Sequence, residues 1–386
     1  MMGTYNFSGK HSYSFPTNIR FGAGVIDELS DHLKKQGLKY PLVVTDPVLC
    51  RLDFFNTIVN NLKKAGLGVE VFSDTHKNPV KSDVLKGAEV YHATQRDCVI
   101  GIGGGVAMDV ARAILLRINH HRDLFDYDDL IGGDKYITEE VPYFITVPTT
   151  AGTGSEVGRS AIISEDESKK KRILFHPKLL ANIVFADPIL TMELPAHITA
   201  ATGMDALTHN MEAYLAKNYH PMCDGIALEG ISLIFDSIEK ATLNPDVESR
   251  SKMMIASLMG AVAFQKGLGI VHSLAHPMSS LLDTHHGLAN AVNLPYGLGF
   301  NYEGFEDRFD IMGFHMGLGA NNGDKVVEAI IKLNEQLEIP NKLRQVGVQE
   351  EHINALADLA IEDFCHPNNP KPVTQSDFKQ LYTEAL

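Results

Sequence analysis

The chain has few cysteines, a deficit of positive charge and no long apolar run, and each absence excludes a class of protein. The four cysteines (Cys50, Cys98, Cys223 and Cys365) form no CxxC pair, which indicates reduced thiols in a cytoplasmic protein and not a disulfide framework. The 34 basic residues face 48 acidic ones, for a formal net charge of −14. This balance argues against nucleic acid or an anionic membrane as a partner.

Targeting and membrane-spanning segments are also missing from the sequence. Residues 1–24 contain neither the apolar stretch nor the small-residue cleavage site of a secretory signal. No stretch approaches the roughly 18 uninterrupted apolar residues that predict a membrane span. A hydrophobic content of 44% and a mean hydropathy of −0.06 are typical of a globular protein. At 386 residues, the chain is long enough for two domains, and we expect it in the cytoplasm.

The first half of the chain alternates short β-branched runs with amphipathic stretches. Strands are predicted over 40–46, 69–72, 97–102 and 143–147, and helices over 55–65, 81–93 and 105–119. Strands that alternate with helices in this way predict βαβ units and a twisted parallel sheet.

The second half loses the strand pattern after residue 187. Helices are predicted there over 200–216, 223–243, 248–267 and 271–282. We therefore expect two domains: an α/β, Rossmann-like nucleotide-binding domain over 1–187 and an all-helical, metal-binding domain over 188–386.

Two loops in the first half suit a nucleotide. The segment 102–109 (IGGGVAMD) follows a strand and opens a helix, so its backbone could approach a pyrophosphate at the helix N-terminus. It is not the GxGxxG fingerprint, and a tight turn that needs glycine only for packing is the alternative. The segment 147–156 (VPTTAGTGSE) also follows a strand. Its hydroxyls suit ribose or phosphate contacts, and a plain surface loop is the alternative.

Asp46 stands at the end of the first clear strand of the sheet. An acid at this point can accept hydrogen bonds from the adenosine ribose hydroxyls, and it would repel a 2′-phosphate. Such a contact favours NAD over NADP. The alternative is that Asp46 caps the turn that it begins with Pro47, and the local sequence leaves both open.

Metal-ligand spacing appears in three segments of the second half. Asp205 and His209 are four residues apart, as are His272 and His276, and the segment 285–287 reads HHG. Residues i and i+4 share one face of a helix, so each pair can reach one ion. Three imidazoles and one carboxylate suit a divalent metal such as Fe(II) or Zn(II).

Any single histidine in these segments could equally be an exposed residue or a buried one that bonds to a carbonyl. The prediction therefore depends on the whole set, and on the glycine-rich loop found with it. A divalent ion can act as a Lewis acid on an alcohol oxygen while a nicotinamide accepts hydride. Spacing alone leaves open whether His276 or His286 is the third imidazole ligand.

The motifs of both halves resemble those of the iron-dependent (group III) alcohol dehydrogenases. The resemblance rests on the segments 103–109 (GGGVAMD), 148–156 (PTTAGTGSE), 201–209 (ATGMDALTH), 271–277 (VHSLAHP) and 286–290 (HGLAN). It covers nearly the whole chain, from residue 18 to about residue 301.

The resemblance implies a specific set of site residues. Metal ligands are expected at Asp205, His209, His272 and His286, and His276 is expected beside the substrate and nicotinamide, as a residue that supports the ligands from outside or transfers a proton and not as a ligand. Cofactor contacts are expected at Asp46, Asn78, Gly104, Gly105, Asp109, Thr149, Thr150 and Lys171.

Three positions depart from the family pattern. Val106 stands where serine is usual, which removes a hydroxyl contact to the cofactor phosphate. Tyr296 stands where histidine is frequent, and we expect it to reshape the cleft. His285 stands where proline is more frequent, and we expect it to have an outer or structural role.

We therefore expect an enzyme: an NAD-dependent, iron-containing dehydrogenase that interconverts an alcohol and an aldehyde or ketone by hydride transfer. Zn(II) suits the same ligands. The alternatives are a hydroxy-acid dehydrogenase or transhydrogenase of the same family, and an NAD-binding lyase with the dehydroquinate synthase-like architecture. The expected partners are a small alcohol or aldehyde and further copies of the chain, in a homodimer or larger homo-oligomer.

Overall fold

A computed structural model describes residues 13–15 and 17–386 of the protein. Within these residues the chain forms two compact units. The sheet unit holds residues 17–150 and 154–191, and the helical unit holds residues 192–386 together with the short segments 13–15 and 151–153. The loop expected to touch a nucleotide therefore contributes residues to both units.

The sheet unit is built on six parallel strands in the order β1-β8-β5-β4-β2-β3. The strands are β1 (Asn18–Phe21), β2 (Pro41–Val44), β3 (Glu70–Phe72), β4 (Cys98–Gly103), β5 (Tyr143–Pro148) and β8 (Ile183–Ala186). From β2 the chain proceeds outward to β3, and from β4 it proceeds in the other direction to β5. The carboxyl ends of β2 and β4 thus form a topological switch point, where open α/β sheets bind ligands.

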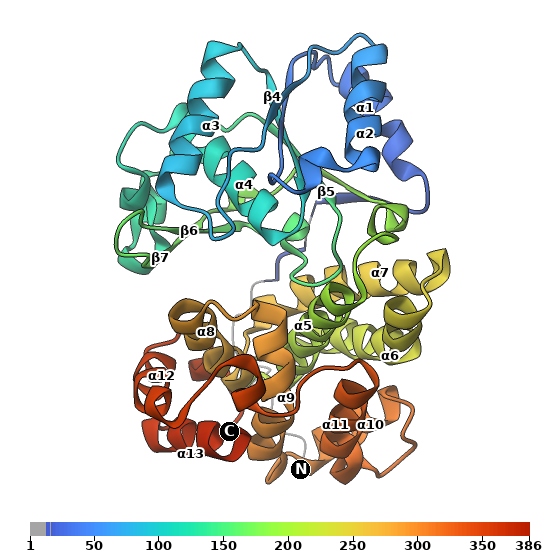
Figure 1. The fold of residues 1–386 in the computed structure, drawn as a ribbon, viewed down its shortest axis with the longest axis vertical. Coiled ribbons are helices and arrows are strands. Elements are labelled where there is room, and N and C mark those ends of the chain that lie inside the picture. Colours follow the sequence, from blue (N-terminus) through green and yellow to red (C-terminus); the bar gives the residue numbers. More distant parts are fainter. Residues whose placement is uncertain (1–12, 16) are drawn as a thin grey trace. The chain divides into compact units, whose positions relative to one another are not determined.

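Helices cover both faces of this sheet, as Figure 1 shows. They are α1 (Leu29–Lys35), α2 (Asp53–Lys64), α3 (Lys81–Ala93) and α4 (Gly105–Asn119). Leu42 and Val44 of β2 pack into the same core as α3 and α4, whereas Val43 packs with α1 and α2. Side chains alternate across a strand, so a strand covered on both faces is apolar at every position.

A two-stranded antiparallel sheet of β6 (Ser160–Ser164) and β7 (Lys171–Phe175) completes the sheet unit. It was not among the predicted strands.

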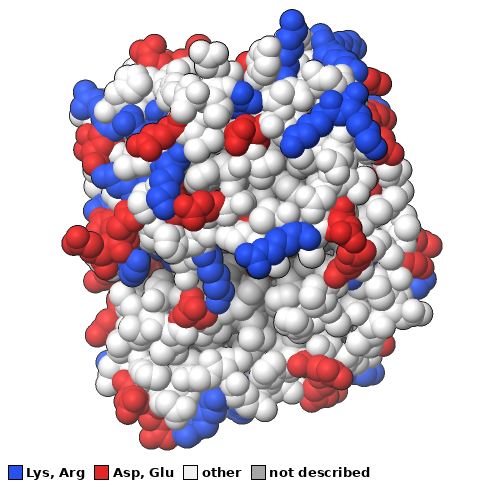
Figure 2. All heavy atoms as spheres, turned by 45° about the horizontal axis from the view of Figure 1, so that its top comes forward, with Lys and Arg blue, Asp and Glu red and all other residues white. Residues whose placement is uncertain are grey.

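On the face shown in Figure 2, Lys and Arg residues are interspersed with Asp and Glu. Such mixing forms no extended field of one sign on that face.

The helical unit contains the helices α5 (Ala196–Leu215), α6 (Pro221–Leu243), α7 (Val247–Ala263), α8 (Ile270–Leu282), α9 (His286–Tyr302), α10 (Glu306–His315), α11 (Val326–Gln336), α12 (Ile353–Ile361) and α13 (Gln375–Ala385). In the described part of the chain every strand lies before residue 187. A parallel sheet followed by helices alone confirms the predicted fold class. Helix α5 is buried along most of its length, so its polar residues lie inside the unit.

No single helix among the described residues is both long enough and apolar enough to cross a membrane. Two consecutive segments, Val247–Lys266 and Ile270–Leu282, meet the length and composition criteria only when taken together, and they are bent by 107°.

Candidate metal centre and glycine-rich turn

Three helices bring four metal-ligating side chains together inside the helical unit. Helix α5 carries Asp205 and His209, one turn apart, α8 carries His272 and α9 carries His286. One potential ligand atom from each of these residues lies within 4.8 Å of those of the other three. The predicted ligands, which are up to 81 positions apart in the sequence, thus form one cluster.

The geometry of the cluster leaves one side open. The Nε2 atoms of His209 and His286 lie 3.9 and 3.4 Å from Oδ1 of Asp205. The rings of His209 and His272 stack with centroids 4.7 Å apart. The side chains of Asp205, His209 and His272 are at most 4% exposed, but that of His286 is 33% exposed. A small molecule can approach the cluster from the side of His286.

Burial keeps the imidazoles in the form that binds metals. It lowers the pKa of His209 to about 4 and that of His272 to about 3, and it lowers the pKa of His286 well below its usual value. Burial also raises the pKa of Asp205, but the neighbouring imidazoles and a hydrogen bond outweigh this effect and bring it to about 2. Near neutral pH the set therefore offers three lone pairs and one negative charge.

The amide of Asn290, one turn after His286 on α9, lies at the centre of this cluster. Its Nδ2 atom donates to Oδ1 of Asp205 at 2.7 Å and lies 3.2 Å from Nε2 of both His272 and His286. One amide nitrogen has two hydrogens and cannot serve three acceptors fully. The donor set therefore has spare acceptor capacity at one point, which fits a divalent cation.

Gly287 allows α9 to approach α5 closely enough to form the cluster. A Cβ atom at this position would lie 2.2 Å from the backbone oxygen of Ala201 and 3.2 Å from Cβ of Asp205. Only glycine leaves room for the two backbones at this distance. The glycine next to His286 in the sequence therefore has a structural reason.

Glu212, which the sequence-based prediction did not include, hydrogen-bonds to one of the four predicted ligands. It is buried, and its Oε2 atom accepts a hydrogen bond from Nδ1 of His272 at 2.6 Å. Its Oε1 atom accepts from the backbone N–H of Val271 at 2.6 Å. The bond to Nδ1 leaves Nε2 of His272 available as a ligand. The sequence could have indicated Glu212, because Asp205, His209 and Glu212 have the spacing of residues on one face of a helix.

Replacing Glu212 by glutamine is expected to weaken metal binding about 10- to 100-fold, the usual cost of losing an outer partner of a ligating histidine. Both oxygens of the Glu212 carboxylate accept hydrogen bonds. In glutamine one of these oxygens is replaced by an NH2 group, which cannot accept, so at least one N–H donor loses its partner. The dissociation constant for Fe(II) or Zn(II), measured by titration against a chelator, checks this. Glu229→Gln, on the exposed surface of α6, is the matched control. Equal affinities in the two variants would contradict the orienting role.

His276 lies beside the cluster and outside the set of four. Its ring stacks on that of His286, with centroids 5.3 Å apart and an interplanar angle of 16°. Its side chain is 25% exposed, and its Nδ1 atom bonds to Oδ2 of Asp363 at 2.7 Å. His276 thus shares the open side of the cluster with His286.

Two of the three positions that depart from the family pattern, His285 and Tyr296, lie in the helical unit. His285 is exposed and directly precedes the first residue of α9. The hydroxyl of Tyr296 donates to the backbone oxygen of Asn341 at 3.2 Å, and Nζ of Lys342 lies 5.5 Å from its ring. Tyr296 therefore packs against the segment that follows α11.

Several of the predicted nucleotide residues lie close together near the switch point of the sheet. Gly103 has a φ of +151°, and a Cβ there would clash with Ala107 at 2.6 Å, so the turn before α4 requires glycine. A Cβ on Gly104 would lie 3.3 Å from Oγ1 of Thr150. The backbone N–H of Thr149 donates to the oxygen of Gly103 at 3.0 Å. The glycine turn and the loop after β5 therefore lie side by side.

Asp46 reaches the same turn from the end of β2. Its Oδ1 atom accepts hydrogen bonds from the backbone N–H groups of Val48 and Leu49 at 2.8 and 2.9 Å. Its Oδ2 atom lies 3.9 Å from the position of a Cβ on Gly103. One oxygen therefore caps the local turn, and the other faces the glycine turn, so the two interpretations of Asp46 are compatible.

The remaining predicted cofactor residues differ in their surroundings. The carboxylate of Asp109 accepts from Oγ of Ser155 at 3.1 Å and from the backbone N–H of Ile162 at 3.2 Å, and it lies 3.4 Å from the buried Arg112. Burial raises its pKa to about 6. Through these contacts Asp109 joins α4 to β6.

Gly105 begins α4, and Val106 follows it in the first helical turn. Asn78 is exposed between β3 and α3, and Lys171 is exposed at the start of β7. Lys171 is near enough to Asp109 to lower the pKa of that carboxyl. These positions lie in the sheet unit with the other predicted cofactor residues.

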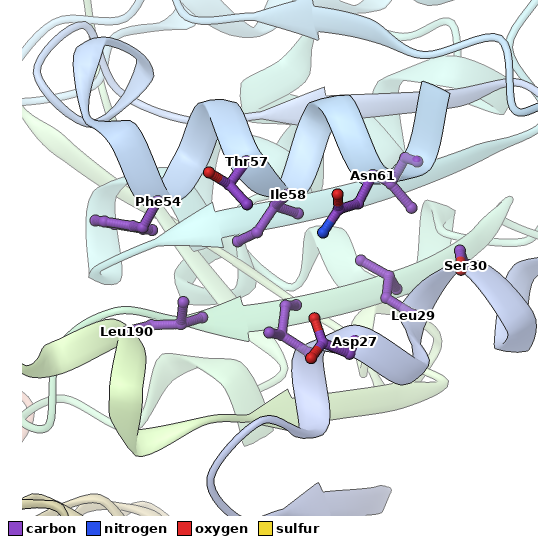
Figure 3. Close-up of a pocket in the computed structure, with 10 residues that line it drawn as sticks. Asp27, Leu29, Ser30, Phe54, Thr57, Ile58, Asn61 and Leu190 are labelled. Atoms are coloured by element: carbon purple, nitrogen blue, oxygen red, sulfur yellow. The ribbon is translucent and has the colours of Figure 1, made fainter. Parts of the chain in front are cut away.

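A separate hollow lies between α2 and the start of α1 with the segment that precedes it, as Figure 3 shows. Leu29, Ile58 and Leu190 contribute apolar side chains to it, and Asp27 and Asn61 contribute polar ones. None of its lining residues is a predicted cofactor residue. It is therefore distinct from the switch point.

Both units match models of one protein family. Residues 16–188 match "iron-containing alcohol dehydrogenase", and residues 199–386 match "Fe-containing alcohol dehydrogenase family, C-terminal". The 4-hydroxybutyrate dehydrogenase of Cupriavidus necator is 37% identical over 96% of this chain and 98% of its own. The NAD-dependent methanol dehydrogenase of Bacillus methanolicus is 34% identical over 97% of this chain and all of its own.

A crystal structure of a 1,3-propanediol oxidoreductase aligns with a TM-score of 0.93, at 31% identity, over 98% of this chain and all of that one. These similarities do not favour the lyase that the sequence left as an alternative. They confirm the resemblance drawn from the motifs and the expectation of an NAD-linked oxidoreductase. The chain belongs to the iron-containing alcohol dehydrogenase family.

Proposed function

We propose that the protein oxidises a short primary alcohol to its aldehyde with NAD, and catalyses the reverse reaction, at the cluster of Asp205, His209, His272 and His286. In the forward direction the carbinol carbon loses a hydride to C4 of the nicotinamide and the hydroxyl loses a proton, so that the products are aldehyde, NADH and one proton. The observation that supports this function best is the set of four ligand atoms within 4.8 Å of one another, in a chain of this family.

The residues in and beside the cluster would have different roles in the reaction. Asp205 and the three imidazoles would hold the metal, and the exposed side of His286 would leave room for the alcohol. When bound, a divalent ion supplies Lewis acidity, which lowers the pKa of an alcohol hydroxyl. His276, which shares that open side, would accept the hydroxyl proton. In the sheet unit, the turn at Gly104 and Gly105 would receive the pyrophosphate at the N-terminus of α4.

The proposed metal is Fe(II), and the proposed cofactor is NAD. Three imidazoles and a carboxylate also accept Zn(II), so Fe(II) is proposed from the family. The preference for NAD is supported by Asp46, whose Oδ2 atom faces the glycine turn. A carboxylate at the end of this strand favours ribose hydroxyls and repels a 2′-phosphate.

The proposed substrates are short molecules that carry a primary alcohol group. The similar proteins are named for methanol, for 1,3-propanediol and for 4-hydroxybutyrate, all of which carry a primary alcohol. The 4-hydroxybutyrate dehydrogenase is similar over nearly the whole chain, and it supports an ω-hydroxy acid as a second candidate. Both candidates use the same hydride transfer.

A homodimer or larger homo-oligomer in the cytoplasm is the proposed state of the protein. Within the described residues β1 pairs with β8 alone and stands at the edge of the sheet, with Phe21 41% exposed. An open strand edge is a ready site for pairing between copies. The four free cysteines fit a reducing compartment.

Protein loaded with Fe(II) under anaerobic conditions is expected to produce NADH from NAD with at least one member of a panel of primary alcohols, diols and 4-hydroxybutyrate. NADP is expected to give a kcat/KM at least about 10-fold lower, because repulsion between like charges costs several kcal/mol. Absorbance of NADH measures both. Metal-free protein is the control. Absence of turnover with every alcohol, and with the corresponding aldehydes and NADH, would refute the proposed function.

A further inference from the structure

The carboxylate of Asp363 contacts the histidine to which the proposed function gives the alcohol proton. Asp363 follows the end of α12, and its side chain is 9% exposed. Its Oδ2 atom lies 2.7 Å from Nδ1 of His276. Its Oδ1 atom accepts from Oγ of Ser273 at 2.6 Å and from the backbone N–H of Cys365 at 2.9 Å. Both oxygens of this largely buried carboxylate therefore have partners.

These contacts define where the proton of the His276 ring lies. Burial raises the pKa of Asp363, but the hydrogen bonds from His276, Ser273 and Cys365 outweigh it and hold the pKa below its usual value. An ionised carboxylate can only accept hydrogen bonds. The proton in the bond to His276 therefore resides on Nδ1, and in the neutral ring Nε2 carries the lone pair.

The His276 ring lies on the open side of the metal cluster. His276 stacks on the partly exposed His286 and is itself 25% exposed. Ser273 lies one turn earlier on α8, and its hydroxyl also accepts from the backbone N–H of His366 at 2.9 Å. The carboxylate that holds the imidazole is therefore itself held by α8 and by the segment after α12.

A second metal site is the other possible use of these residues. Potential ligand atoms of His276, Asp363 and Cys365 lie within 4.8 Å of one another. Burial, however, raises the pKa of the Cys365 thiol well above its usual value, and a protonated thiol is a poor ligand. The oxygens of Asp363 already accept three hydrogen bonds. These observations favour a hydrogen-bonded pair over a second ion.

We propose that Asp363 is a positioning residue that holds His276 as the Nδ1–H tautomer, with Nε2 aimed to accept the alcohol proton. The inference rests on the proposed function, in which His276 accepts that proton while hydride leaves for NAD. Asp363 touches neither substrate nor cofactor and acts through His276. A carboxylate that orients a catalytic imidazole in this way sets both its tautomer and its direction.

The tautomer is measured first, on metal-free protein labelled with ¹⁵N-histidine. Long-range ¹H–¹⁵N spectra, recorded about two pH units above the ordinary histidine pKa, distinguish a protonated Nδ1 from a protonated Nε2. His276→Gln removes one ring and so assigns the signals. We expect Nδ1–H in the wild type and loss of that population in Asp363→Asn. The Nε2–H tautomer in the wild type, or an unchanged tautomer in Asp363→Asn, would overturn the proposal.

Kinetics of the Fe(II)-loaded enzyme supply the second readout. Asp363→Asn is expected to lower kcat at least about 100-fold, the usual scale of general acid–base catalysis, while KM and metal content change less than about twofold. The double variant with His276→Gln should be no slower than His276→Gln alone, because the two residues act as a unit. Asp358→Asn, exposed on α12, is the matched control.

Two results would overturn the proposal at this stage. One is independent, additive losses from the two substitutions. The other is a second equivalent of bound metal that disappears in Asp363→Asn, which would make Asp363 a ligand. If the wild type oxidises no alcohol at all, the proposed function fails, and the tautomer measurement still decides whether Asp363 positions His276. That measurement on the wild type also stands if Asp363→Asn does not fold.

Discussion

Replacing His272 by alanine is expected to abolish bound metal and turnover together. His272 lies inside the cluster, is nearly fully buried, and presents Nε2 to it because Glu212 takes Nδ1. The variant removes one of four proposed ligands and leaves the carboxylate of Glu212 without its imidazole partner. The loss of metal affinity should exceed the roughly 10- to 100-fold cost of removing an outer partner. Metal analysis of the purified variant and NADH absorbance measure the two effects.

His276→Gln is the informative comparison for this variant. It should retain the full metal content, because His276 lies outside the set of four, and it should lose turnover at least about 100-fold, because it removes the proposed proton acceptor. If His276→Gln lost the metal while His286→Ala kept it, the ligand assignment would be wrong.

Replacing Gly287 by alanine is expected to disrupt the metal centre without removing a ligand. The new Cβ would lie 2.2 Å from the backbone oxygen of Ala201, and a backbone atom cannot move aside as the end of a side chain can. Helix α9 must shift away from α5, and His286 and Asn290 shift with it. We expect a destabilisation at or above the 1–3 kcal/mol typical of overpacking, together with a loss of metal affinity of at least about 10-fold.

Gly299→Ala provides a matched control on the same helix. Gly299 is exposed, and a Cβ added there meets nothing within 4 Å. Alanine in a helix interior is favoured over glycine by roughly 0.5–1 kcal/mol, so this variant should be as stable as the wild type or slightly more so. Denaturant unfolding and metal titration compare the two. Gly287→Ala protein with unchanged stability and affinity would show that α9 tolerates the shift.

Several buried elements of the sheet unit were predictable from the sequence because their chemistry is periodic. The predicted helices 81–93 and 105–119 coincide with α3 and α4, and the predicted strands 40–46 and 97–102 contain or overlap β2 and β4. Strands β1, β6, β7 and β8 were not predicted. Most residues of β1 and β7 are exposed or half-buried, and such strands lack the apolar pattern that burial imposes on central ones. Strand β8 is buried at all four positions, and so short an apolar run does not by itself distinguish a strand from a buried helical segment.

Local spacing placed Asp205 and His209 on one face of α5, because residues four apart on a helix are neighbours. Spacing placed His272 and His276 on one face of α8 by the same rule, and left open whether His276 or His286 is the third imidazole ligand. The structure brings His272 into the cluster and His276 onto its open side. This difference depends on the direction from which α9 approaches.

By itself, the sequence determined several of the buried strands and helices, the glycine turn, and the types and local spacing of the proposed ligands, all of which depend on neighbours close in the sequence. Only the tertiary structure decided how they combine. Glu212 meets His272 across 60 positions of sequence, and Asp363 meets His276 across 87. No local pattern records such pairs, because they form only when helix backbones pack closely, as α9 does against α5 at Gly287.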